Sequence, residues 1–589
     1  MFAKSRQSPF RSPHDTDRSN AEATDSPAPP DRRHRLCRPL ATYALRGLAI
    51  HQDQVLALDA ARGHLLLVDL ATDCTEVLNV YQVGDFLDAI GLAIGPPLAG
   101  ADVPSVWFTR DREVLACNWG QWEPKPMYTL PEWVEGVAIY RSTLYVSSQR
   151  SGCIYVLDLN TGREITRFYA PGIGVENLVA RGEELWVCDR LEQTVYCLDR
   201  ATGLVNFSVL TPYESPTALA FDQAGTLWVA YSGEEPYIRD NPNDPEPLQV
   251  AFRDRVTIGP LDYGFYPDRG YALSNGYRIE MFYVEELSPL EGVDFSLLKD
   301  LEWRISLPAN TDRQTVQSVE PVGMPFEIEL LPDGQQVAVF KFGSIERGEG
   351  RLFGWKAIID VRGIRYQLTP PDVERLPSLA DCQLPADYTE KYLVDNDNLA
   401  MDQPSVRAAA REAIGTETNL LRQMLAIRNY VYDRLGYRIR RSIEPPDAVL
   451  DRGYGCCGEY VGVLLALSRL NGIATRTVGR YKCPQPADRT QVALYPDYNH
   501  VWLEFFIPGF GWVPMESNPD DIQEGGPYPT RYFMALPWNH VEIAKGSRFQ
   551  GIQLGGQPLA ELSDLKVGDL ALNHVRFRIL EELDPLDRP

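Results

Sequence analysis

The chain has 589 residues, is 44% apolar and carries a formal charge of −24, so it is long enough for about three to five domains with substantial cores. An acidic surface disfavours binding to nucleic acid and to anionic membranes. Ten cysteines spread over this length do not form a disulfide framework, no apolar run approaches the length of a transmembrane helix, and no apolar signal segment opens the chain. We therefore expect a soluble, cytoplasmic protein that binds neither nucleic acid nor membrane.

Residues 1–39 are rich in Ser, Pro, Asp and Arg and contain few apolar side chains. A segment of this composition cannot bury enough apolar surface to offset the entropy of folding. We predict a disordered tail.

Residues 40–270 contain a repeat with a period in the low forties. Similar segments open at Gly47, Gly91 and Gly136, which are separated by 44 and 45 residues. Three or four short strands per unit at this period are typical of a β-propeller, and the units resemble NHL-type and YVTN-type propeller repeats. We count five units, and residues 248–281 together with the strand before Gly47 could complete a sixth. We expect this propeller to act as a scaffold or to bind a protein partner, without catalytic residues.

Residues 275–370 contain short runs of alternating or continuous apolar residues separated by turns such as Pro332-Asp333-Gly334. Short strands at this spacing predict a β-sandwich. The fold class predicted for the whole chain is therefore multidomain, with a mainly β N-terminal propeller and β-sandwich followed by an α+β core at residues 378–545. Residues 546–589 form a C-terminal extension, and its acidic end at 576–589 is expected to fray.

The predicted core begins with helices and leads into a pair of cysteines. Apolar spacing predicts a helix over residues 418–435, and a second, amphipathic helix starts at the cysteine pair and ends before Gly472. Cys456 and Cys457 then lie at a helix start, where unpaired N–H groups and the positive end of the helix dipole favour a thiolate.

A nucleophile needs a base and a group that orients the base, and both are found downstream. Two apolar runs flank Pro508-Gly509-Phe510-Gly511, which predicts a β-hairpin. Positions 500 and 516 are centred on 508, inside this turn, so His500 and Glu516 are predicted to lie near each other on one face. A thiol, an imidazole and a carboxylate together indicate acyl transfer.

Several alternatives remain open on chemistry alone. Cys456 could be the nucleophile in place of Cys457. His540 and His574 stand in similar Asn-His-Val segments and could be the base, although neither is followed by a comparable hairpin with an acid. A cysteine pair could also bind a metal, but no second Cys/His pair stands at a zinc spacing, so we expect no metal and no cofactor.

The segment from 378 to 521 resembles the transglutaminase-like superfamily. Gly455-Cys456-Cys457 matches the G-x-C motif that opens the core helix, which implies Cys457 as the nucleophile. The residues after His500 resemble the family's H-x-W-x-E strand, and Gly511–Glu516 resembles its G-W-x-P-x-D strand. The chain departs from the pattern at Glu516, where the family usually has Asp.

The resemblance implies a papain-like cysteine enzyme with Cys457, His500 and Glu516 as its catalytic residues. Such an enzyme acts on amide bonds of a protein or peptide substrate through a thioester, and we favour hydrolysis over crosslinking. The alternative is a catalytically inert protein in which the propeller recognises a partner. The sequence predicts no oligomeric state.

Overall fold

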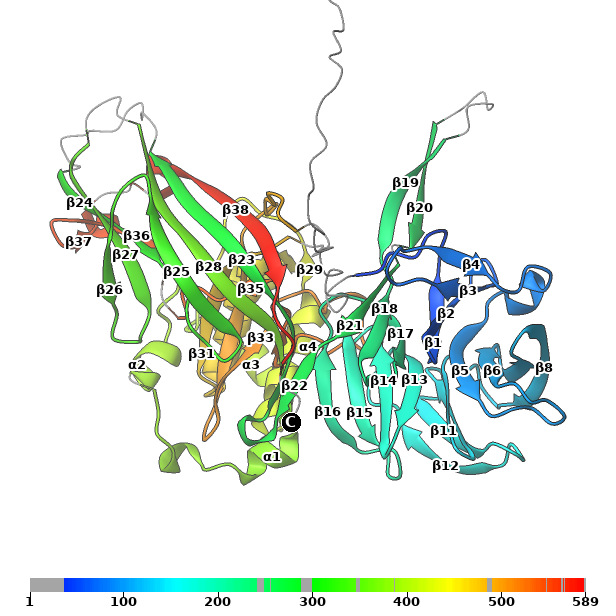
Figure 1. Ribbon diagram of the computed structural model, residues 1–589. Coiled ribbons are helices and arrows are strands. Elements are labelled where there is room, and N and C mark those ends of the chain that lie inside the picture. Colours follow the sequence, from blue (N-terminus) through cyan, green and yellow to red (C-terminus); the bar gives the residue numbers. More distant parts are fainter. Residues whose placement is uncertain are drawn as a thin grey trace, which may run out of the picture.

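The computed structural model describes residues 36–586, except for 241–247, 255, 288–298, 346–349, 386, 485–489, 547, 563–564 and 566. The predicted tail at residues 1–39 lies almost wholly outside the described residues. The N-terminal half consists of many small antiparallel sheets with few helices, and the longer helices lie between residues 404 and 470 (Figure 1).

Five small sheets follow one another between residues 45 and 261 and lie on the right of Figure 1. The first contains Leu45–His51 (β1), Gln54–Asp59 (β2), His64–Val68 (β3) and Thr75–Val77 (β4). The second contains Ile90–Gly95 (β5), Ser105–Arg110 (β6), Glu113–Asn118 (β7) and Gln121–Thr129 (β8). The third contains Val137–Tyr140 (β9), Thr143–Ser148 (β10), Cys153–Asp158 (β11) and Glu164–Tyr169 (β12). The fourth contains Val175–Arg181 (β13), Glu184–Asp189 (β14), Thr194–Asp199 (β15) and Val205–Leu210 (β16), and the fifth contains Pro216–Phe221 (β17), Leu227–Tyr231 (β18) and Thr257–Leu261 (β21).

The first strands of these sheets contact one another in a closed order. β1 contacts β5, β5 contacts β9, β9 contacts β13, β13 contacts β17, and β17 returns to β1. The Thr217 hydroxyl donates to the carbonyl of Leu45 at 2.8 Å across the last of these contacts. A cavity of about 170 Å³ is lined by all five strands. We refer to these five sheets as the ring.

The residues considered for a sixth repeat do not form a sixth sheet of the ring. Leu248–Asp254 (β20) pairs with Glu234–Asp240 (β19) in a two-stranded sheet, and Tyr271–Leu287 (β23) belongs to a sheet outside the ring. The chain before β1 does reach the fifth sheet, because Cys37 and Ile258 exchange two backbone hydrogen bonds of 2.8 Å. The five inner strands already close the ring, which leaves no position for a sixth sheet.

Two larger sheets lie on the left of Figure 1. One contains Tyr263–Tyr266 (β22), Tyr271–Leu287 (β23), Gln314–Val322 (β25), Arg351–Tyr366 (β28), Ala535–Leu536 (β34) and Ala571–Glu582 (β38). The other contains Lys299–Ser306 (β24), Glu327–Leu330 (β26), Gln336–Ser344 (β27), Gln550–Leu554 (β36) and Gln557–Pro558 (β37). Fully buried side chains from both sheets, such as Ile279, Trp303 and Trp355, belong to one hydrophobic core.

Residues 576–582 do not fray as predicted, because they belong to β38, whereas 587–589 lie outside the described residues. β38 pairs with β23 from Leu287↔Ala571 to Tyr277↔Glu582. Phe577 and Ile579 are fully buried on the core side of this strand, and Arg578 between them is half-buried. Burial of this apolar face outweighs the acidic composition on which the prediction rested.

The segment between these strands forms a helical core against a small sheet. Its helices are Pro370–Arg375 (α1), Tyr388–Tyr392 (α2), Pro404–Ile414 (α3), Leu420–Arg434 (α4), Pro446–Arg452 (α5) and Cys457–Leu470 (α6), with Leu559–Leu562 (α7) and Val567–Leu570 (α8) further on. The sheet has the order β33-β32-β31-β35, with Thr475–Lys482 (β31), His500–Ile507 (β32), Gly511–Met515 (β33) and His540–Val541 (β35), and Gly436–Tyr437 (β29) pairs with Tyr454–Gly455 (β30). None of the described helices is both long and apolar enough to cross a lipid bilayer.

The ring is joined to the helical core by buried polar contacts. The indole N–H of Trp538 donates to the carbonyl of Pro212 at 3.0 Å, and the Tyr532 hydroxyl donates to the Gln193 side chain at 2.5 Å. The backbone N–H of Thr530 donates to the carboxylate of Glu192 at 2.8 Å. The chain that follows β33 is therefore held in place by the ring.

Candidate active site

Cys457 is the first residue of α6, and its position is fixed by hydrogen bonds around the helix start. The backbone N–H of Cys456 donates to the Glu459 carboxylate at 3.0 Å, which satisfies a donor that the helix leaves free. Arg452 binds the same buried carboxylate at 2.9 Å. The turn before the helix is thereby tied to its first turn, and Cys457 has little freedom to move.

The Cys457 thiol lies beside the backbone on both sides of His500. Its sulfur is 4.0 Å from the carbonyl oxygen of Asn499, and the N–H of Val501 favours its ionised form. The residue is only 7% exposed, and burial, followed by the negative charges of Cys456 and Glu516, raises the pKa of the thiol. The helix start alone therefore does not produce the thiolate that we expected, because desolvation outweighs it.

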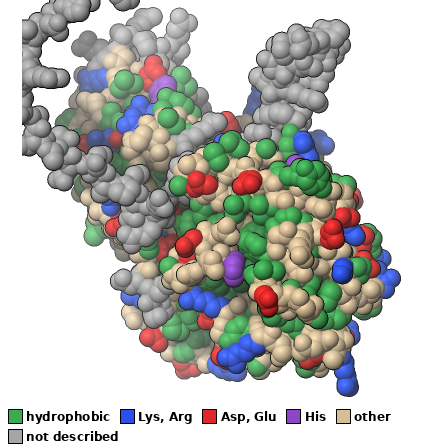
Figure 2. Space-filling view, turned by 45° about the vertical axis from the view of Figure 1, so that its right-hand side comes forward, with side chains coloured by type: hydrophobic (Ala, Val, Ile, Leu, Met, Phe, Trp, Pro, Cys, Tyr) green, Lys and Arg blue, Asp and Glu red, His purple; other side chains and the backbone are tan. Residues whose placement is uncertain are grey.

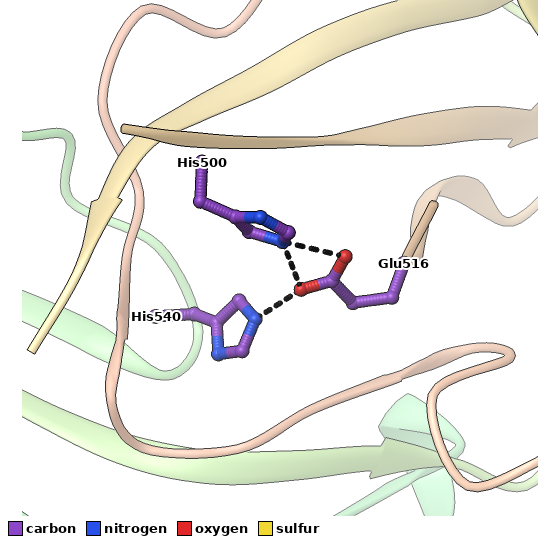
Figure 3. Close-up of side chains that lie close together, drawn as sticks. All are labelled: His500, Glu516 and His540. Carbon is purple, nitrogen blue, oxygen red and sulfur yellow. Dashed lines mark hydrogen bonds and ion pairs between the residues drawn. The ribbon is translucent and has the colours of Figure 1, made fainter. Parts of the chain in front are cut away.

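The hairpin brings His500 and Glu516 together, but its turn is centred one residue away from the prediction. Leu503 pairs with Met515 and Ile507 with Gly511, so the turn is centred on 509 and not on 508. His500 and Glu516 are consequently diagonal neighbours. The Glu516 carboxylate still reaches the His500 ring, with its two oxygens 2.7 and 2.9 Å from Nε2 (Figure 3).

A second histidine binds the same carboxylate. Nε2 of His540 forms a hydrogen bond to Oε1 of Glu516, and both imidazoles point at the carboxylate in Figure 3. His540 was considered only as an alternative base, and its contact with Glu516 was not anticipated. The one signal in the sequence is that Asn539-His540-Val541 repeats Asn499-His500-Val501. His574 lies elsewhere, on β38, where it is exposed and 2.7 Å from Glu286.

His500, Glu516 and His540 form a buried cluster, and their side chains are at most 4% exposed. Burial opposes the ionisation of Glu516, but the positive charges of His500, Lys482 and His540 hold the pKa of this carboxyl well below its usual range. Burial lowers the pKa of His540 to about 3, although the negative charge of Glu516 and its hydrogen bond oppose this shift. The cluster therefore contains a carboxyl group that stays ionised and a histidine whose burial disfavours its charged form.

The three side chains of this cluster are also a possible metal-binding set, because their ligand atoms all lie within 4.8 Å of one another. Two ligands of one tetrahedral zinc ion are roughly 3.3 Å apart at ordinary zinc–ligand distances. The separations between the His500 nitrogen and the Glu516 oxygens are shorter and are those of hydrogen bonds. Lys482 adds a positive charge 3.9 Å from Glu516. The present geometry thus favours a hydrogen-bonded cluster, and a metal ion would have to push the ligands apart.

Tyr437, which the sequence did not single out, lies close enough to the thiol for the two groups to interact electrostatically. Burial, followed by the negative charges of Cys457, Tyr498, Cys456 and Glu516, raises the pKa of Tyr437 to about 12. Tyr437 is 38% exposed, so one residue near the buried thiol is open to solvent.

Comparison with protein families identifies the central part of the chain. Residues 407–517 match the Transglutaminase-like superfamily. The chain thus contains a transglutaminase-like domain, which includes Cys457, His500 and Glu516 and ends before His540. No curated protein sequence matches the chain.

Three solved structures show a distant similarity to the chain. A candidate cysteine protease from Cytophaga hutchinsonii is 16% identical, with 54% of this chain and 95% of that chain covered and a TM-score of 0.37. Glutaminyl cyclase from Myxococcus xanthus is 12% identical, with 38% and 95% covered and a TM-score of 0.27. Regucalcin from Agrobacterium tumefaciens, a calcium-binding protein, is 15% identical, with 37% and 78% covered and a TM-score of 0.24.

Proposed function

We propose that this protein is a cysteine enzyme of the transglutaminase-like kind, which acts on amide bonds of a protein or peptide substrate through a thioester. The observation that carries the proposal is the position of Cys457, at a fixed helix start and beside the backbone that flanks His500, together with the hydrogen bonds from Nε2 of His500 to Glu516. Because Nε2 is engaged, Nδ1 is the nitrogen of His500 that can serve the thiol.

Burial favours a neutral thiol in the resting enzyme, so proton transfer accompanies attack. The sulfur of Cys457 bonds to the amide carbon while its proton passes to Nδ1 of His500, and Glu516 stabilises the imidazolium that results. The oxyanion faces the backbone N–H of Cys457. His500 then gives the proton to the leaving amine, the carbon–nitrogen bond breaks, and a thioester remains. Water attacks the thioester with His500 as base, which releases the acid and the free thiol.

Hydrolysis is proposed over transfer to an amine. A thioester survives to meet an amine only where water is kept out. The thiol itself is buried, but Tyr437, which interacts electrostatically with it, is 38% exposed, and this supports access of water to the site. Peptidase or amidase activity is therefore the proposed outcome.

The ring is proposed to be a five-bladed β-propeller that acts as a scaffold. Its inner strands contact one another in a closed circle and line a common cavity, which supports this assignment. Acidic and basic side chains are interspersed with apolar ones on the face shown in Figure 2. Cys74, Cys117 and Cys457 are among the described cysteines that form no disulfide, which supports a reducing compartment such as the cytoplasm.

The second candidate function is an inert, partner-binding protein. Glu516 in place of the family's usual Asp and the raised pKa of Cys457 favour it.

The two candidates predict different reactivity of the Cys457 thiol. We would measure the rate of Cys457 alkylation by iodoacetamide in the wild type and in His500→Ala, with the exposed Cys74 as the reference thiol in the same samples.

A base that assists the thiol makes Cys457 react faster in the wild type than in His500→Ala, whereas the Cys74 rate stays equal. Equal Cys457 rates in the two proteins would instead favour the inert alternative. A panel of peptides, assayed for both cleavage and amine incorporation, then identifies the reaction, and the absence of both products from an active-thiol protein would contradict amide chemistry.

A further inference from the structure

Glu516 contacts two histidines, and only one of them, His500, takes part in the proposed reaction. Oε1 accepts hydrogen bonds from both His500 and His540, and Oε2 accepts from His500 and from the backbone N–H of Ser517 at 2.9 Å. His540 lies outside the residues that match the family. Its contact with Glu516 therefore needs an explanation of its own.

A glutamate at this position needs more support than an aspartate. It has one more rotatable bond, and the hairpin register places it diagonally to His500 and not directly opposite. Lys482 lies 3.9 Å from Oε1 and offers the carboxylate a competing partner. Without a further contact, the carboxylate could turn from the imidazole towards this ammonium group.

His540 is fixed well enough to supply that contact. Its strand pairs with β31 through Lys482↔His540, and its ring packs edge-on against Trp502 with 5.0 Å between the ring centroids. The side chain is 3% exposed, and Trp502 is fully buried. Such a side chain loses little entropy when it forms a hydrogen bond, because packing already selects its rotamer.

The protonation of His540 depends on burial and on its neighbours. Burial lowers its pKa to about 3, Glu516 opposes this shift, and the positive charges of Lys482 and His500 add to it. Nδ1 of His540 lies 3.0 Å from Oδ1 of Asn539, and Nε2 is the nitrogen that contacts Glu516. In the proposed reaction, the proton from the thiol goes to His500.

We propose that His540 is a positioning residue, whose Nε2–H holds the Glu516 carboxylate in the orientation that binds Nε2 of His500. The inference rests on the proposed function, because it concerns the group that orients the base. It also explains how a glutamate can stand where the family usually has an aspartate: the longer side chain reaches both histidines.

The test compares two substitutions of His540 in the full-length protein. His540→Gln can place an amide N–H near the position of Nε2, whereas His540→Phe keeps a ring against Trp502 and removes the donor. We would measure the rate of Cys457 alkylation by iodoacetamide between pH 5 and 9 for both variants, the wild type and His500→Ala, with Cys74 as the reference.

We expect His540→Phe to slow the alkylation of Cys457 by roughly tenfold, in the range seen when groups that support a reactive residue are removed, and His540→Gln to restore most of the rate. A merely structural role predicts equal rates for the Gln and Phe variants. If His540→Phe matches the wild type while His500→Ala is slow, the inference is wrong and the proposed function stands. If His500→Ala matches the wild type, the proposed function itself fails.

A measurement on the wild type covers the case in which the Phe variant does not fold. In ¹⁵N-histidine-labelled protein, His540 should carry its proton on Nε2 and show no titration between pH 8 and 5. A proton on Nδ1 alone, or a titration in this range, would overturn the inference.

Discussion

Glu504 and Glu516 lie on the same hairpin and are equally buried, yet their partners are of different kinds. Glu504 binds the ammonium of Lys545 at 2.7 Å and the guanidinium of Arg476 at 2.6 Å. Glu516 binds two imidazoles. Lysine and arginine keep their charge at any working pH, whereas an imidazole can gain or lose a proton there. The comparison teaches that a buried carboxylate paired with permanent cations has partners of fixed charge, whereas one that also contacts an imidazole can stabilise a positive charge that the imidazole gains.

The largest effect is expected when an imidazole partner of Glu516 is removed. His500→Ala removes the proposed base, so peptide turnover should fall by about 10²–10⁴-fold. The melting temperature should change little, because Glu516 keeps His540 and Lys482 as partners. Turnover and thermal unfolding are measured on the same preparation. A large loss of stability with retained turnover would assign His500 to the fold.

The next largest effect is expected when Glu504, the carboxylate paired with permanent cations, is removed. Glu504→Ala leaves Lys545 and Arg476 buried without this carboxylate, and removal of one partner from a buried ion pair costs about 3–5 kcal/mol in the free energy of unfolding. Denaturant unfolding measures this cost. Glu327→Ala, which removes an exposed partner of Lys341, is the matched control and should be nearly neutral. Equal effects of the two substitutions would contradict the structural role of Glu504.

The histidine side of the comparison also predicts a pH dependence of the free energy of unfolding. His540 has a pKa of about 3 in the folded protein, below the ordinary value of 6.5. Between these two pH values the unfolded chain binds one proton that the folded chain does not, so the free energy of unfolding falls as the pH falls, by about 1.4 kcal/mol per pH unit. The melting temperature recorded from pH 7 to pH 4 should drop less steeply in His540→Gln. Parallel curves would show that His540 is charged in the fold.

The smallest effect concerns the neutral contact between the ring and the core. Tyr532→Phe removes one buried hydrogen bond to Gln193 and should cost about 1 kcal/mol. The backbone carbonyl of Tyr532 accepts from the N–H of Glu516 at 3.2 Å, so the same residue also supports the site. Thermal unfolding measures the cost, and the Cys457 alkylation rate should change by less than in His540→Phe. A larger rate effect would mean that the ring governs the site more strongly than His540 does.

Local patterns in the sequence located much of the candidate site. The start of α6 at Cys457 follows from the helical spacing of the residues after it, and the turn after β32 follows from Pro508-Gly509-Phe510-Gly511. A turn motif fixes the existence of a hairpin more firmly than its register, which is why the predicted centre was one residue off. The contact of His500 with Glu516 survived this error because the side-chain face was unchanged.

The remaining features depend on contacts between distant segments. His540 reaches Glu516 because β35 pairs with β31, a pairing of two residues for which the local sequence carries no signal. The raised pKa of Cys457 depends on burial by other segments, which the position at a helix start does not reveal. β38 was missed because its charged residues obscured the alternation of Phe577 and Ile579.

The pairing of β38 with β23 has a consequence for synthesis. The two strands are adjacent in space, but nearly three hundred residues separate them along the chain, and the whole transglutaminase-like domain lies between them. During translation, β23 leaves the ribosome long before its neighbour exists, so one edge of it waits unpaired while the domain is made. This β-sheet can be completed only after the proposed catalytic residues have been synthesised, and a nascent chain stalled before residue 571 would expose the unpaired edge of a long strand to chaperones or to aggregation.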